Sequence, residues 1–140
     1  MSININALET SFDHLAARGD ELVDAFYGRL FAVAPGVQPL FAGTDLKKQK
    51  GMLLAALVLL RRSLRDLDSV VPQLRAMGAR HVGYGARPEH YPVVGEVLIA
   101  SMAEIAGDVW TAEYDQAWTE AFAVVAGAML DGANSVEFAA

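Results

Sequence analysis

The spacing of apolar residues along the chain is the feature that most constrains its fold. Apolar side chains recur every three or four positions, in segments separated by glycine, proline and capping residues, as in amphipathic helices. Neither the alternation of a β-strand nor a hairpin dipeptide of the Asn-Gly type interrupts this pattern. The sequence therefore predicts an all-α protein, and its 140 residues fit a single domain over 1–140.

Start and stop signals divide the chain into six main helices with short connecting turns. The expected helices are a first segment that stops at Gly19, a second that Asp20 caps and Pro35 ends, a third over 46–64, a fourth capped at Asp68 or Ser69, a fifth over 88–106, and a sixth from a Thr111 cap to Asp131-Gly132. A short turn through Phe41 and a loop that ends in the cap Asp45 connect the second helix to the third.

Composition and charge exclude several classes of function. The formal net charge of -6 argues against nucleic acid, which binds basic surfaces, and the absence of cysteine excludes disulfides and thiolate metal sites. The first residues do not resemble a signal peptide, and the longest apolar runs, 52–60 and 121–130, are shorter than the ~20 residues of a membrane span. We expect a cytoplasmic protein that does not bind membranes. The apolar fraction of 54% fits either an apolar cavity or a buried oligomer face, so both monomer and homodimer stay open.

His81 is the candidate ligand among three histidines. It lies on an inward helix face, whereas we expect His14 and His90 at the surface. The other residues of that face are Leu74, Met77 and Tyr84. An inward histidine alone is more often a hydrogen-bonded core residue than a ligand, and that interpretation stays open. The sequence has no second histidine at ligand spacing, no acidic metal loop, no hydrolase elbow and no nucleotide-binding glycine motif. A lone imidazole in an apolar helical shell suits haem, which supplies four nitrogens of its own.

A set of short motifs in fixed order then carries a family resemblance. The motifs are Phe26-Tyr27-x-x-Leu30-Phe31, Pro39-Leu40-Phe41, Gln49 with Leu53, Arg80-His81-x-x-Tyr84, Glu89-His90-Tyr91-x-x-Val94-Gly95-Glu96 and Ala117-Trp118. Each motif is weak alone, but the ordered set resembles the bacterial single-domain globins and the haem domain of flavohaemoglobins, over about 9–130. The resemblance implies a globin fold around a haem pocket, with helices crossing at ~50°.

The resemblance also implies roles for individual residues. It makes His81 the iron ligand of haem b (iron protoporphyrin IX), with Tyr27 and Gln49 on the opposite, distal side. Core packing is the alternative for Tyr27, and exposure in a lysine-rich turn is the alternative for Gln49. The remaining residues expected at the cofactor are Phe41, Leu53, Leu57, Met77, Arg80, Tyr84 and Tyr91.

The proximal side differs from the resembled family in one respect. We expect the His81 ring to donate to the backbone carbonyl near Met77, with Tyr91 folded back toward the ring. The family's glutamate in the last helix falls at Ala133 here, and we expect Asp131 to point elsewhere. An anionic partner for the imidazole is therefore missing, which weakens any expectation of peroxidase-style chemistry or efficient oxidation of NO.

The functional hypothesis is a haem protein that binds dioxygen reversibly, and also NO or CO, for storage or delivery. A first alternative is an NO dioxygenase that works with a separate reductase. A second is a haem-free interaction module in which His81 belongs to the core.

Overall fold

Six α-helices and three short 3-10 helices make up the computed structural model, which describes residues 4–139. The α-helices are α1 (Ile5–Ala16), α2 (Gly19–Val33), α3 (Leu46–Arg62), α4 (Val71–Gly83), α5 (His90–Ala106) and α6 (Ala112–Ala139). The 3-10 helices are η1 (Pro35–Phe41), η2 (Leu67–Val70) and η3 (Gly107–Val109). The prediction of an all-α fold with six main helices is confirmed.

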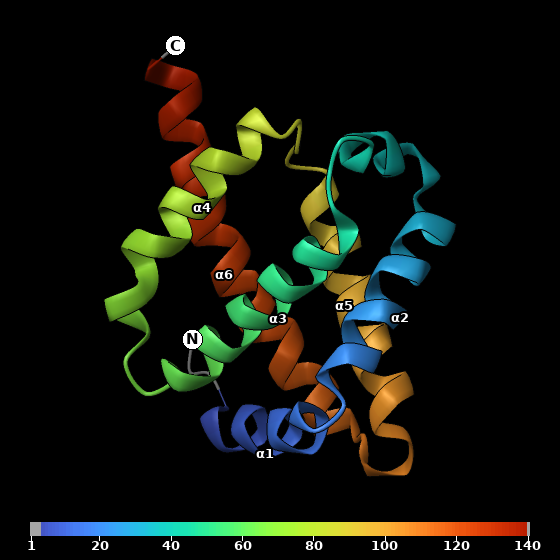
Figure 1. The fold of residues 1–140 in the computed structure, drawn as a ribbon. Helices are drawn as coiled ribbons and strands as arrows, with labels where there is room; N and C mark the ends of the chain where they lie inside the picture. Colours follow the sequence, from blue (N-terminus) through green and yellow to red (C-terminus); the bar gives the residue numbers. More distant parts are fainter. Residues whose placement is uncertain (1–3, 140) are drawn as a thin grey trace.

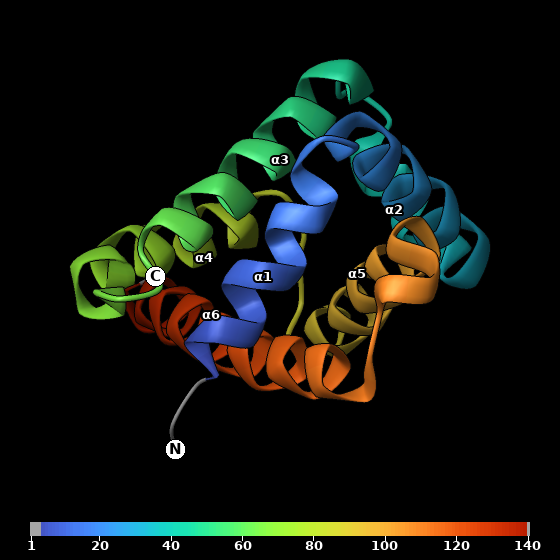
Figure 2. The ribbon, with the colours of Figure 1, turned by 90° about the horizontal axis from the view of Figure 1, so that it is seen from below.

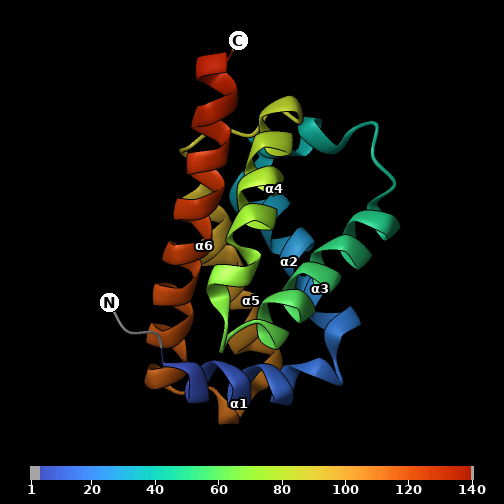
Figure 3. The same ribbon diagram turned by 90° about the vertical axis from the view of Figure 1, so that its left-hand side faces the viewer.

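The helices enclose a space between two groups of elements. In Figure 1, α2 and α5 lie together on one side, and α4 lies with α6 on the other. Helix α3 crosses between the two groups, and α1 closes the base. Figure 2, seen from below, shows α1 lying across the other helices. Helix α4 packs against α6 more extensively than any other pair of elements, and Figure 3 shows the two side by side.

Two apolar clusters hold this arrangement together. The larger cluster joins α1, α2, α3, α5 and α6 and includes Trp118. The indole N–H of Trp118, which is buried, donates to the Ser11 hydroxyl at 2.8 Å, and so links α6 to α1. A smaller cluster lies under α4 and is made of Val70, Leu74, Tyr91 and Met129. The helix that carries His81 therefore packs on a cluster of its own.

Some predicted helix starts are confirmed and others are wrong. The Asp45 carboxylate accepts from the Lys47 backbone N–H at 3.0 Å, and so caps α3 as predicted. The Thr111 hydroxyl likewise accepts from a backbone N–H at the start of α6. Asp20 does not cap α2, because the helix already begins at Gly19 and Asp20 lies in its first turn.

The fourth helix also starts differently from the prediction. Neither Asp68 nor Ser69 caps α4, because the 3-10 turn η2 leads directly into it. The Ser69 hydroxyl instead donates to the Asp66 carbonyl at 2.7 Å. Pro72 does lie in the first turn of α4, where its missing N–H leaves no hydrogen bond unmade.

The last helix is longer than predicted. Asp131-Gly132 was expected to end it, but α6 continues to Ala139, and Gly132 is a buried residue in the helix interior. Tertiary packing outweighs the weak helix propensity of glycine at this position. No helix within residues 4–139, α6 included, combines the length and apolar character required to cross a membrane.

Candidate functional site

One apolar cavity of about 310 Å³ lies between the two groups of helices. Its size is within the range of small-molecule sites, ~300–1,000 Å³. The wall brings together residues of α2, η1, α3, α4 and the start of α5. The sequence-predicted residues on this wall are Tyr27, Phe41, Gln49, Leu53, Met77, Arg80, His81 and Tyr84. Residues from five separate elements thus meet at a single space.

His81 reaches the cavity with a fixed ring orientation. Its Nδ1 lies 2.6 Å from the Met77 carbonyl oxygen, one helical turn earlier. A carbonyl only accepts, so Nδ1 carries a proton, and in the neutral ring Nε2 then keeps a free lone pair. The Tyr84 ring packs edge-on against the imidazole, with 5.4 Å between the ring centroids. The predicted hydrogen bond of His81 is confirmed, and it leaves Nε2 as the nitrogen that can act as a ligand.

Tyr27 stands in an aromatic wall contributed by α2 and η1. Its ring contacts those of Phe26, Phe31 and Phe41 at centroid distances of 4.9, 6.0 and 5.8 Å. Tyr27 is 4% exposed, and burial raises the pKa of its phenol, an effect that the adjacent Gln49 side chain partly offsets. The raised pKa keeps the phenol protonated at neutral pH. Tyr27 is therefore an O–H donor at the wall of the cavity.

Gln49 extends the polar part of the cavity beside Tyr27. It lies in the first turn of α3, where its backbone N–H donates to the Asp45 carbonyl at 3.0 Å. Its side chain is half-buried and lines the cavity, while Lys47 and Lys48 before it are exposed. Leu53, one turn later, lines the same wall. The Gln49 side chain thus lies next to the Tyr27 phenol on the cavity wall.

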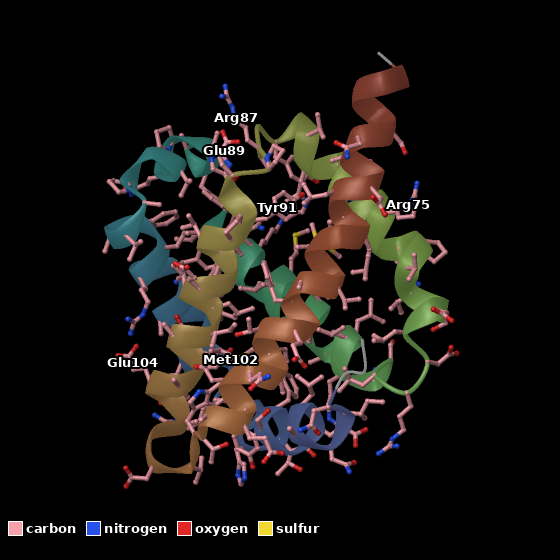
Figure 4. All side chains as sticks on the ribbon, turned by 180° about the vertical axis from the view of Figure 1, so that it is seen from behind. Arg75, Arg87, Glu89, Tyr91, Met102 and Glu104 are labelled. Atoms are coloured by element: carbon pink, nitrogen blue, oxygen red, sulfur yellow. The ribbon has the colours of Figure 1, made fainter. Side chains whose placement is uncertain are left out.

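Two of the residues expected at the cofactor lie away from this wall. Leu57 is buried in the larger apolar cluster. Tyr91 belongs to the smaller cluster under α4, with Leu74 and Met129 among its neighbours, and burial raises its pKa. Figure 4 shows Tyr91 directed from α5 into the interior toward α6. The structure therefore places Tyr91 in the smaller cluster, with residues of α4 and α6, and not among the residues that line the cavity.

His90 was expected at the surface, but it is half-buried and lines the cavity. The Arg87 backbone N–H donates to its Nδ1 at 3.1 Å, so Nδ1 is unprotonated and the neutral ring carries its proton on Nε2. The signal that could have found it is its spacing to Val93 and Val94, which share its helix face and also line the cavity. The remaining wall residues are Phe26, Leu30 and Leu40, which belong to the motifs quoted above, and Ala34, Val37, Met52, Ala56 and Ala86, which the sequence did not single out.

Position 133, where the resembled family carries a glutamate and this chain an alanine, is buried in the protein. Ala133 is 7% exposed, on the side of α6 that faces the protein interior. Asp131 is exposed and pairs with Arg75 of α4 at 3.8 Å, so it points elsewhere as predicted (Figure 4 labels Arg75). Within the described residues, no group of three or more histidine, aspartate or glutamate side chains could share a metal ion. The hydrogen-bond acceptor of the His81 ring is thus a neutral carbonyl.

Comparison with known proteins gives consistent matches over most of the chain. The globin family model matches residues 24–129. A flavohemoprotein of Bacillus subtilis is 30% identical over 128 residues, which are 90% of this chain and 32% of that protein. A flavohemoprotein of Xylella fastidiosa has the same identity over 129 residues, 91% of this chain and 32% of its own length. The chain thus spans about a third of the curated relatives it matches.

A solved structure shares the whole fold. A bacterial globin from Campylobacter jejuni superposes with a TM-score of 0.83 at 22% identity, over 95% of this chain and 96% of that one. This likeness extends to the helices on both sides of the cavity.

Proposed function

The chain belongs to the globin family, and on that premise we propose that it holds haem b and binds dioxygen reversibly, and also NO or CO. The observation that carries this proposal is the opposition of two groups across one apolar cavity. His81 presents a neutral nitrogen from α4, and the Tyr27 phenol lies on the α2 wall. A haem bound here would supply an iron with one position open to a diatomic ligand.

The residues of the cavity fit the chemistry of haem. An apolar macrocycle needs apolar walls, which Phe41, Leu53 and Met77 provide. The ferrous iron needs a neutral imidazole of fixed orientation, and the Met77 carbonyl fixes that of His81. Arg80 and His90 border the same cavity and carry N–H donors suited to the propionate carboxylates.

The distal residues supply hydrogen-bond donors. A ligand that takes on partial negative charge is stabilised by a preorganised donor in a site that excludes water. The Tyr27 hydroxyl is fixed by its aromatic neighbours, and the Gln49 amide lies beside it. Leu53 keeps water away from the same wall. We therefore assign the principal donor role to Tyr27 and an auxiliary role to Gln49.

A second candidate function is NO dioxygenation with an electron-supplying reductase. The flavohemoprotein relatives favour it, because their name combines a flavin with a haem. The neutral carbonyl acceptor of His81 speaks against it, because among the side chains that the structure describes no carboxylate hydrogen-bonds to the imidazole and increases its electron donation. A haem-free interaction module is the third alternative, in which the cavity holds no cofactor.

An oxygen equilibrium measurement combined with a turnover assay separates these functions. The purified protein would be loaded with haem, reduced and titrated with dioxygen, and then supplied with NO, NADH and a flavin reductase. The proposal predicts reversible oxygenation over repeated cycles and slow NO consumption. Rapid, repeated conversion of NO to nitrate would favour the dioxygenase, and failure to retain haem would favour the interaction module.

A further inference from the structure

The proximal helix α4 touches α6 through backbone atoms at two glycines. A Cβ atom built on Gly78 of α4 would lie 1.8 Å from the carbonyl oxygen of Met129 in α6. A Cβ atom built on Gly132 of α6 would lie 1.9 Å from the carbonyl oxygen of Arg75 in α4. The contact is therefore reciprocal: each helix offers a glycine to a carbonyl of the other.

Among the glycines that the structure describes, only these two would bring a Cβ atom against the backbone of another helix, whereas a Cβ atom on Gly95 would meet the Phe122 side chain at 2.6 Å. A Cβ atom built on Gly127, also in α6, would meet nothing within 4 Å, so alanine is tolerated there. At Gly78 and Gly132 the obstructing atoms are backbone carbonyls, which cannot move aside by rotation of a side chain. Any side chain at either glycine must push the two helices apart.

The contact lies within one helical turn of the candidate iron ligand. Gly78 precedes His81 by three residues, and its neighbour Met77 supplies the carbonyl that holds the His81 ring at 2.6 Å. The same short segment of α4 thus rests on α6 and fixes the imidazole. Figure 3 shows α4 lying along α6 over this length.

We infer that the Gly78–Gly132 backbone contact is a positioning device that sets how closely the His81 imidazole can approach the haem iron. The inference rests on the proposed function. Closely packed interfaces transmit small displacements, because their atoms have no free space in which to relax. Here α6 is the fixed support, the glycines set the spacing, and α4 carries that spacing to His81. Gly78 and Gly132 are positioning residues that act through His81.

The direct test is Gly132→Ala in the haem-loaded protein, with Gly127→Ala as the matched control in the same helix. We expect Gly132→Ala to shift the ferrous iron–histidine stretching frequency in the resonance Raman spectrum. It should also change the dioxygen dissociation constant by roughly tenfold, which corresponds to ~1.4 kcal/mol. Gly127→Ala should leave both quantities unchanged. An unshifted frequency in Gly132→Ala would overturn the inference.

Detaching the ligand from the helix separates positioning from a general loss of stability. In a His81→Gly background with imidazole added to the haem protein, the ligand is no longer tied to α4. There, Gly132→Ala should leave the iron–imidazole frequency unchanged, although it still lowers the melting temperature. An equal shift with and without the tether would show that the glycine acts by another route.

A third variant adds no atoms to the contact and tests the inference even if the alanine variants do not fold. Arg75 pairs with Asp131 and contacts the Ser135 hydroxyl at 3.3 Å, and these polar contacts flank the glycines. Asp131→Asn combined with Ser135→Ala should leave the frequency unchanged, because the glycine spacing persists. A clear shift would assign the spacing to the polar contacts and overturn the inference. If the unmodified protein binds no haem, the proposed function fails instead.

Discussion

Replacing Tyr27 with phenylalanine removes the hydroxyl and leaves the aromatic wall in place. The ring sits between Phe26 and Phe41 at centroid distances of 4.9 and 5.8 Å, so the phenylalanine ring should occupy the same position. Tyr27 is 4% exposed, and its raised pKa keeps the phenol a donor at neutral pH. The substitution therefore deletes one hydrogen bond with little change in cavity volume.

The size of the effect follows from the charge on the ligand. A hydrogen bond to a charged or partly charged group contributes ~1.5–3 kcal/mol, and ~1.4 kcal/mol corresponds to a tenfold change. Tyr27→Phe should therefore accelerate dioxygen release by about ten- to hundredfold. Association should change far less, because affinity differences arise mainly in dissociation. CO carries little negative charge when bound, so its release should barely change.

Stopped-flow ligand replacement with dioxygen and CO measures both dissociation rates on the same sample. Phe41→Leu is the steric control, because it changes the packing of the wall and removes no polar group; it should affect the two ligands to similar degrees. Equal effects of Tyr27→Phe on dioxygen and CO, or no effect on either, would refute the assignment of Tyr27 as the stabilising donor.

Three further predictions test the second donor and the stability of the fold. Gln49→Leu should change the stretching frequency of bound CO and the dioxygen dissociation rate. The change should be smaller than that caused by Tyr27→Phe, because the Gln49 amide lies only partly in the cavity. An unchanged CO spectrum would place the amide in solvent. Ser11→Ala should lower the free energy of unfolding in urea by ~1–3 kcal/mol, since it leaves the buried Trp118 N–H without its acceptor. Adding Trp118→Phe should bring no further loss of hydrogen bonding. Strictly additive losses in the free energy of unfolding would argue against a hydrogen bond between the two side chains. The Arg61 guanidinium holds the pKa of Asp13 below its usual value. This pair therefore stabilises the fold above the unfolded pKa of ~3.9, and the stabilisation is lost as the pH falls through the lower pKa of the folded state. Asp13→Asn should flatten the pH dependence of the melting temperature in that acidic range, and an unaltered profile would contradict the linkage.

The fold could be predicted because its signals are local. The apolar spacing and the caps at Asp45 and Thr111 act within a few residues, and each has its counterpart in the structure. The hydrogen bond of His81 is also local, since its acceptor lies one turn earlier in the same helix. Such features follow from backbone geometry alone.

The features that could not be predicted depend on contacts between distant segments. Gly132 follows the pattern of a helix stop, yet it lies inside α6, where a carbonyl of α4 leaves no room for a side chain. The sequence predicts a surface position for His90 beside Glu89, but the turn before α5 directs its ring to the cavity. Tyr91 was expected at the cofactor, but it lies in the smaller apolar cluster with residues of α4 and α6 and does not line the cavity.

The central claim, that His81 holds a haem iron in this cavity, is tested most directly by absorption spectra of the purified protein and its His81→Ala variant. The spectra would be recorded in the ferric, ferrous and CO-bound forms after loading with haem. We predict an intense Soret band that shifts on reduction and again on addition of CO. His81→Ala should lose stable haem binding or regain it only with added imidazole. Full haem retention with an unchanged ferrous spectrum in His81→Ala would contradict the account.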